Sequence, residues 1–277
     1  TVYSFSCTEK FSENFKLLLN FVQNPYFTET GVEKEKDIIK QEINMYRDNP
    51  GWRSFFNLLK SLYKENPVRK DIVGNIESID RINKDMLYKC YNVFYHPSNM
   101  VIFVIGDVDI NQIFDQVDSL IISNLENPEI KRIFPEDSPE INKEYTEERM
   151  SVAIPIFQMG FKDDISNIKD EELITREVTM KILLEILIGR SSKLYSQLYE
   201  DGLINNTFEF DYTNEENYAY SIIGGESKEP YKVREKLFEI IECMLKNGVC
   251  EEAFERVKKA TYGRTIRWFN SLEKVSE

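Results

Sequence analysis

The chain has 277 residues, of which 35 are basic and 48 acidic, and its net charge at pH 7 is −13. Because nucleic acids and anionic membranes repel a strongly negative surface, we expect neither as a partner. No apolar run reaches the roughly 18 residues that a membrane span needs. A hydrophobic content of 42% is enough for the core of one large domain or of two ordinary ones.

Residues 1–125 predict a strand, a series of helices, a second strand and a last helix. Thr1–Ser6 is β-branched and aromatic, and Met100–Ile105 is apolar on both sides, as expected of a central strand. Polar capping residues precede the runs with helical periodicity. The expected helices begin near Ser12, Thr28 or Thr30, Trp52, Ser78, Asn83 and Asp109.

Residues 126–150 are rich in Pro, Glu, Lys and Asn, which predicts an extended linker. Residues 151–277 then predict a strand at Val152–Phe161, a hairpin around Asn214–Asn217, and helices near 172–188, 230–246 and 251–269. The order strand, helix, helix at 1–47 recurs at 218–269. We therefore predict an α+β fold of two related domains, each an antiparallel sheet packed with helices and both incomplete.

The helix expected over Gly31–Pro50 carries two unusual carboxylates. Apolar residues at helical spacing mark a stripe that we expect to be buried, and Glu42 lies inside it, with Glu35 two turns earlier on the same line. Buried carboxylates are normally paired, protonated or bound to a metal. The pair therefore indicates an ordinary salt bridge, a stripe edge that reaches water, or a metal ligand, Glu42, supported by Glu35. The stripe consists of Ile38, Ile39, Ile43 and Tyr46.

Other catalytic chemistry is poorly supported by the sequence. His96 is the only histidine and lies in an aromatic-proline turn, so a structural role is the better interpretation. Asp107 and Asp109 resemble a metal pair, but capping of the next helix explains them better. The four cysteines form no Cys-x-x-Cys pair. We interpret them as free, mostly buried thiols of a reducing compartment, and we expect a cytoplasmic protein.

Several motifs in this order resemble the insulinase/pitrilysin (inverzincin) family of zinc metallopeptidases, which includes the mitochondrial processing peptidase. The resemblance covers nearly the whole chain and is strongest to the bacterial two-domain branch. It is carried by four stretches, which are Glu35-x6-Glu42 followed by Asp48-Asn49-Pro50, Tyr95–Met100 running into Gly106-Asp107-Val108, Gly160-Phe161-Lys162-Asp163, and the run from Gly189 to Leu203.

The resemblance implies that Glu42 is the third zinc ligand and that Glu35 supports it. The family's His-x-x-Glu-His helix, which supplies two zinc ligands and the general base, is absent and would precede Thr1. We therefore expect this chain to be a truncated, inactive piece of a zinc metallo-endopeptidase that hydrolyses peptides or short unfolded segments in an enclosed chamber. Zinc is expected in the full-length parent and not in this piece.

A second departure concerns the Arg and Tyr with which many catalytic members hold the substrate. Tyr199 stands at the Arg position and Asn205 near the Tyr position, so this substrate-binding pair is degenerate. The resemblance then implies a homologous second subunit that supplies the Arg/Tyr pair, or a homodimer. The competing interpretations are a non-catalytic member acting as a chamber or assembly subunit, and a protein-binding α+β scaffold.

Overall fold

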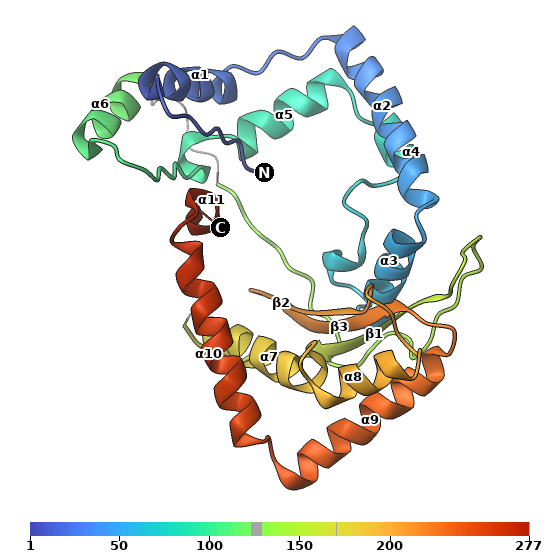
Figure 1. Cartoon of the computed structure of the whole chain (residues 1–277). Helices are drawn as coiled ribbons and strands as arrows, with labels where there is room; N and C mark the ends of the chain where they lie inside the picture. Colours follow the sequence, from blue (N-terminus) through green and yellow to red (C-terminus); the bar gives the residue numbers. More distant parts are fainter. Residues whose placement is uncertain (123–128, 170, 277) are drawn as a thin grey trace. The chain divides into compact units, whose positions relative to one another are not determined.

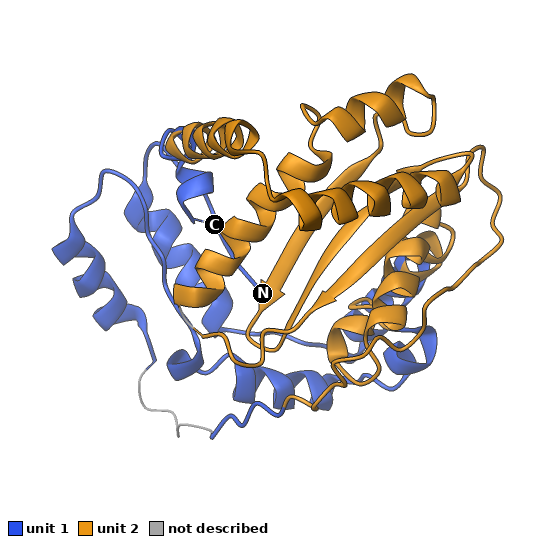
Figure 2. Cartoon of the chain, turned by 90° about the horizontal axis from the view of Figure 1, so that it is seen from below, with its two compact units in different colours: residues 1–42, 75–133, 267–277 blue, residues 43–74, 134–266 orange. Residues whose placement is uncertain are grey.

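The computed structural model describes residues 1–122, 129–169 and 171–276. It divides into two compact units (Figure 2). Unit 1 comprises residues 1–42, 75–133 and 267–277, and unit 2 comprises residues 43–74 and 134–266. Both units are discontinuous in sequence. The domain boundaries expected from the sequence stay a prediction.

Unit 1 consists of helices joined by extended segments. Asn83 caps α5 and Asp109 caps α6, as predicted, whereas α4 is capped by Asn75, with Ser78 as the reciprocal partner in a capping box. Gln23 ties α1 to the end of α6, because its side chain donates to Leu120 O at 3.1 Å. The elements are α1 (Phe11–Gln23), most of α2 (Glu29–Arg47), α4 (Ile76–Asp80), α5 (Lys84–Phe94), η2 (Pro97–Asn99), α6 (Ile110–Leu120) and α11 (Leu272–Ser276).

Two strands predicted in unit 1 are wrong. Residues 1–6 and 100–105 are extended but form no β-ladder with any described residue, and Val101 is 89% exposed. A strand requires a neighbouring backbone to satisfy its N–H and C=O groups. β-branched composition alone therefore does not make these segments into a sheet.

Unit 2 is built on a three-stranded antiparallel sheet of order β1-β3-β2. The predicted hairpin is confirmed, since β2 and β3 pair from Glu209↔Gly224 to Glu215↔Tyr218. The first strand begins later than expected, at Ile156, where its pairing with Glu226 starts. The elements are α3 (Pro50–Leu62), η1 (Pro67–Arg69), β1 (Ile156–Asp163), α7 (Glu171–Ile188), α8 (Lys193–Glu200), β2 (Glu209–Glu215), β3 (Tyr218–Glu226), α9 (Pro230–Asn247) and α10 (Glu251–Trp268).

The sheet is covered on both faces, and alternate residues of β3 divide between two cores. Ala219 and Ile223 belong to the larger core, which α7, α8 and α9 complete, whereas Tyr220 packs with Leu59 and Tyr63 at the α3 side. Figure 1 shows α3 on one face and the three helices on the other. The α+β class is confirmed by this arrangement of helices on an antiparallel sheet.

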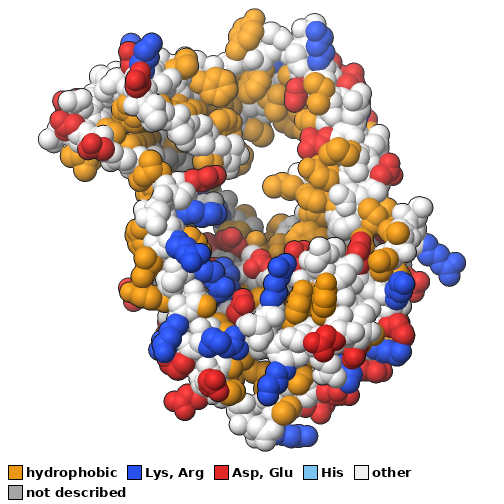
Figure 3. Space-filling model, viewed as in Figure 1, with side chains coloured by type: hydrophobic (Ala, Val, Ile, Leu, Met, Phe, Trp, Pro, Cys, Tyr) orange, Lys and Arg blue, Asp and Glu red, His pale blue; other side chains and the backbone are white. Residues whose placement is uncertain are grey.

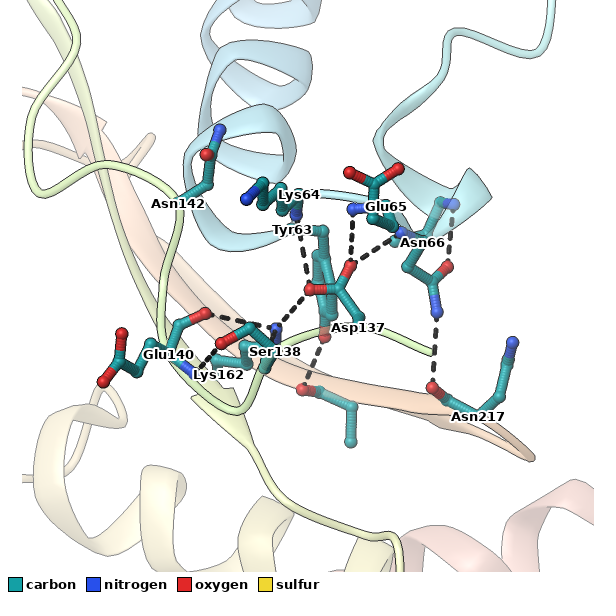
Figure 4. Close-up of polar contacts among 12 residues, drawn as sticks. Tyr63, Lys64, Glu65, Asn66, Asp137, Ser138, Glu140, Asn142, Lys162 and Asn217 are labelled. Carbon is teal, nitrogen blue, oxygen red and sulfur yellow. Dashed lines mark hydrogen bonds and ion pairs between the residues drawn. The ribbon is translucent and has the colours of Figure 1, made fainter. Parts of the chain in front are cut away.

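The segment predicted as a linker has no regular structure over its described residues, but it is bound to α3. The backbone N–H groups of Asn142 and Lys143 both donate to Ser61 O, at 2.8 and 2.9 Å. Asp137 accepts hydrogen bonds from the backbone N–H groups of Glu65 and Asn66, at 2.8 and 2.6 Å (Figure 4). This part of the segment is therefore a component of unit 2.

The surface carries charged side chains of both signs (Figure 3). Figure 3 shows acidic and basic side chains interspersed over the face in view. None of the described helices combines the length and the apolar character that would let it cross a membrane.

Candidate functional site

Helix α2 carries Glu35 and Glu42 on a face that is open to solvent. Both are exposed, and Ile38 between them is 57% exposed. Seven residues at 1.5 Å rise place the two carboxylate positions about 10 Å apart along the helix. Met45 continues the same line and is also exposed. The prediction that Glu42 lies within a buried stripe is therefore wrong, and of the ordinary alternatives the edge that reaches water is the one observed.

The buried line of α2 is the neighbouring one, made by Val32, Lys36 and Ile43. Lys36 accounts for the difference between the expected and the observed buried face of α2. Lys36 Nζ donates to Asp80 O at 3.2 Å and pairs with Glu33 at 2.9 Å, so its charge is satisfied while its stem is covered. Hydrophobic periodicity assigns such a lysine to the solvent side, which rotates the expected buried face towards Ile38.

A second lysine, Lys40, pins α2 to α4. Its Nζ lies 2.7 Å from Asp80 Oδ1. The hydrogen bond between them raises the pKa of Lys40 and lowers the pKa of Asp80. These contacts orient α2 so that Glu35 and Glu42 face away from α4. In the described part of the chain neither carboxylate has an ion-pair partner.

The described residues do not by themselves form a zinc site. Nowhere in the described ranges do three His, Cys, Asp or Glu side chains group closely enough to hold a metal. A catalytic zinc is held by about three protein ligands, so Glu42 alone does not fit one. The only histidine is engaged elsewhere, since His96 Nδ1 lies 2.7 Å from Ser98 Oγ and accepts from Ser98 N–H. The structural role predicted for His96 is confirmed.

Two further predictions are decided by local geometry. Asp109 caps α6, with its Oδ1 accepting from Asn111 N at 2.9 Å, as the capping interpretation predicts. The four cysteines are free, as predicted, but all four are exposed, so the expected burial is wrong. Each lies on a polar helix face or in a loop, which single-residue hydrophobicity does not reveal.

Tyr199 and Asn205 lie around the end of α8 and differ in what they can do. The helix ends at Glu200 with Asp201 as its C-cap, and Gly202 follows with a φ of 68°, the left-handed conformation that glycine adopts most easily. Tyr199 is 54% exposed and stacks on Tyr195, with ring centroids 6.1 Å apart. Its hydroxyl has no hydrogen-bond partner among the described residues, so its ring and hydroxyl are available to a ligand.

The amide of Asn205 is engaged through both its nitrogen and its oxygen within unit 2. Its Nδ2 donates to Glu226 Oε2 at 2.7 Å, and its Oδ1 accepts from the backbone N–H and the hydroxyl of Thr207. This side chain joins the turn after α8 to the end of β3. A structural function therefore accounts for all of its hydrogen-bonding groups.

Sequence reasoning missed a buried polar cluster beside α3. Lys162, from the Gly160–Asp163 motif, pairs with Asp137 at 3.0 Å and lies over the Tyr63 ring, 4.6 Å from its centroid (Figure 4). Burial opposes ionisation of Asp137, but hydrogen bonds from the backbone N–H groups of Asn66 and Glu65 and from Lys162 outweigh it and lower the pKa of Asp137 to about 2. A lysine near the end of a mainly apolar strand was the available signal.

Comparison with known proteins places these features in a family. Residues 1–75 match the family model described as insulinase (peptidase family M16), and residues 81–261 match the model described as the peptidase M16 inactive domain. The uncharacterized zinc protease YmfH of Bacillus subtilis is 42% identical over 280 residues, which is 100% of this chain and 65% of the relative.

Two other relatives differ in what their names state. A solved structure from Alicyclobacillus acidocaldarius, described as an M16-like peptidase, has a TM-score of 0.90 and 34% identity, over 97% of this chain and 64% of its own. The probable inactive metalloprotease YmfF of B. subtilis is 28% identical over 40% of this chain and 27% of its own length. The chain thus spans just under two thirds of YmfH and of the Alicyclobacillus protein.

Proposed function

Because this chain belongs to the M16 (insulinase) family of peptidases, we propose that its full-length parent is the zinc-binding subunit of a metallo-endopeptidase. The parent would hydrolyse peptides or short unfolded segments in an enclosed chamber. The first relatives matched are longer than this chain and are named or described as peptidases, which supports this proposal. The 277 residues alone are proposed to be inactive and to bind no zinc.

The open acidic face of α2 is the observation that carries the proposal. Glu42 is exposed, has no ion-pair partner among the described residues, and follows Glu35 by two turns on one face. An exposed carboxylate on a rigid helix costs little desolvation and is free to serve as one oxygen ligand. In the proposed parent, two histidines that the 277 residues do not supply would complete the zinc site, and Glu35 would support it.

The Tyr199 and Asn205 positions support a division of labour between subunits. The amide of Asn205 is occupied within unit 2, and a phenol at Tyr199 does not reproduce the bidentate grip of a guanidinium. We propose that a homologous second subunit supplies an Arg/Tyr pair, with a homodimer as the other arrangement. Full peptidase activity of the purified parent, with no gain on adding a homologous subunit, would contradict this division.

The test of the zinc proposal compares two carboxylates of α2 in the full-length protein. Glu42→Gln is expected to lower the zinc content and abolish peptide hydrolysis. Glu33→Gln is the matched control, because nine residues of helix place Glu33 on the opposite side of α2 from Glu42. Glu33 itself is exposed, and Lys36 keeps its hydrogen bond to Asp80 O when the Glu33 charge is removed. Equal zinc content in both variants and the native protein would contradict the proposal.

A non-catalytic chamber or assembly subunit is the second candidate. It is favoured by the match of residues 81–261 to the inactive-domain model and by the lack of a three-donor cluster among the described residues. Under this alternative, Glu42→Gln leaves zinc content unchanged and leaves stability unchanged or improved. The expected cytoplasmic location of the protein stays a prediction under both candidates.

A further inference from the structure

Unit 2 contains a pocket whose lining is positively charged, although the protein as a whole is strongly acidic. The pocket has a volume of about 240 Å³ and lies between α3, η1 and residues 142–146. Its charged lining residues are Lys60, Arg69 and Lys143, and the described lining includes no Asp or Glu. Three cations that line one pocket in a chain of net charge −13 call for an explanation.

None of these three cations forms an ion pair within the described residues. Ion pairs are present elsewhere in unit 2, such as Arg176–Asp163 and Lys162–Asp137, but Lys60, Arg69 and Lys143 take part in none. Glu148 interacts electrostatically with Lys60, but its carboxylate is ion-paired with Arg53 and accepts a hydrogen bond from Asn57 Nδ2. Glu148 therefore compensates only part of the positive charge of the pocket.

Arg69 contributes a second and independent sign of a missing partner. Its Nε atom is buried and has no hydrogen-bond partner among the described residues. An N–H that loses water without gaining an acceptor is destabilising, and native proteins rarely keep one without a reason. The Nε and Nη groups of a guanidinium form the planar fork that matches two oxygens of an oxyanion.

Hydrogen bonds brace the pocket without using the charged ends of these side chains. Ser61 O accepts from the backbone N–H groups of Asn142 and Lys143, and Asn142 Nδ2 donates to Lys60 O at 2.9 Å. The hydroxyls of Ser61 and Thr146 lie 2.9 Å apart. The third cation, Arg69, is the last residue of η1. The capping residue of η1 is Asn66, which donates its backbone N–H to Asp137 and its side-chain amide to Asn217 O. The walls are thus preformed.

We propose that this pocket binds a phosphate-class oxyanion, held by the Arg69 fork and by the ammonium groups of Lys60 and Lys143. A phosphoryl group carries a charge of about −1.5 to −2 at neutral pH, so three cations suit it better than they suit the single charge of a carboxylate. The pocket lies outside the Glu35/Glu42 face and the Tyr199/Asn205 turn, and the proposal does not depend on peptidase activity.

The test measures binding of inorganic phosphate and of phosphoserine to the full chain by titration calorimetry, at matched ionic strength, with acetate as the carboxylate probe. Arg69→Gln and Lys143→Gln are each expected to weaken phosphate binding by about tenfold, since each removes one charge-assisted contact. Lys64→Gln is the control, because Lys64 is exposed and does not line the pocket. Its binding constant is expected to stay unchanged.

A phosphate monoester such as phosphoserine distinguishes a free phosphate from a phosphoryl group on a larger molecule, because pyrophosphate gains affinity from its greater charge alone. Tighter binding of the monoester than of inorganic phosphate assigns the pocket to the larger ligand, and equal binding assigns it to single phosphate groups. The proposal is overturned if neither anion binds, if acetate binds as tightly as phosphate, or if Lys64→Gln weakens binding as much as Arg69→Gln. Lys143 contacts α3 through its backbone, so Lys143→Gln tests the site even if Arg69→Gln disturbs folding.

Discussion

Lys162 of β1 and Asp137 of the preceding segment form an ion pair, with Nζ and Oδ1 3.0 Å apart and side chains only 10% and 8% exposed. Lys162 also donates to Ser138 O, and Asp137 also accepts from backbone N–H groups after α3. The pair therefore joins three segments, which are the end of α3, the extended segment and the sheet. A buried pair of this kind is costly to break, because the remaining charge is left unpaired.

We predict that Asp137→Ala destabilises the protein by about 3 kcal/mol or more, because it leaves the Lys162 charge and the N–H groups of Glu65 and Asn66 unpaired. Urea denaturation measures the loss. Lys131→Gln is the control, since its pair with Glu129 is exposed and contributes under about 1 kcal/mol. Equal denaturation midpoints for the two variants would contradict this account of the pair.

The lowered pKa of Asp137 predicts how stability depends on pH. Its folded pKa of about 2 lies below the usual value of 3.8, so the folded state favours the charged form. The resulting stabilisation, about 2 kcal/mol, is present above pH 4 and is lost as the pH falls towards 2. Free energies of unfolding measured from pH 6 to pH 2 should show a smaller acid loss in Asp137→Asn than in the native chain. If the free energy of unfolding falls equally with pH in Asp137→Asn and in the native chain, the lowered pKa of Asp137 does not contribute to stability.

Two glycines are predicted to respond to alanine with opposite signs. A Cβ on Gly224 would lie 2.4 Å from the backbone oxygen of Phe157 on the neighbouring strand, which cannot move without breaking the β1–β3 ladder. Gly224→Ala is therefore expected to cost about 1–3 kcal/mol or more, as overpacking does. Gly263 lies in α10 with nothing within 4 Å of its Cβ position, so Gly263→Ala should stabilise by up to about 1 kcal/mol. Thermal unfolding of both variants provides the comparison.

Alanine substitutions at Tyr199 and Asn205 are predicted to have different effects on stability and activity. Asn205→Ala removes hydrogen bonds to Glu226 and Thr207 and should cost about 1–2 kcal/mol. Tyr199→Ala removes an exposed ring and should change stability by under about 0.5 kcal/mol. If Tyr199 contacts substrate, its variant raises KM in the full-length protein. A large loss of stability with unchanged KM would assign Tyr199 to structure instead.

Much of the helical content could be predicted because its signals are local. Asn83 and Asp109 cap the helices they precede, and α9 begins at Pro230 as expected, since capping and proline geometry depend on neighbouring residues only. The β2–β3 hairpin follows from alternation on either side of a polar turn. The family resemblance was likewise carried by short ordered motifs, and the comparisons confirm it.

The rotation of α2 could not be predicted, and it decides how the candidate site appears. Lys36 is buried because Asp80, 44 positions away, accepts from it, and no local pattern contains that contact. Glu35 and Glu42 are consequently open to solvent rather than enclosed. The zinc role of Glu42 was inferred from the resemblance and stays a prediction, because no described cluster of donors tests it.

The sequence by itself determined the helices, the hairpin, the family and the positions of the conspicuous carboxylates, because each depends on residue types at short spacing. The tertiary structure decided which segments become strands, which face of α2 is buried, and which charges are paired. Thr1–Ser6 lacks a partner strand among the described residues, Lys162 is buried with Asp137, and Lys60, Arg69 and Lys143 line one pocket. The physical reason is that pairing, burial and charge compensation require partners that are distant in the chain.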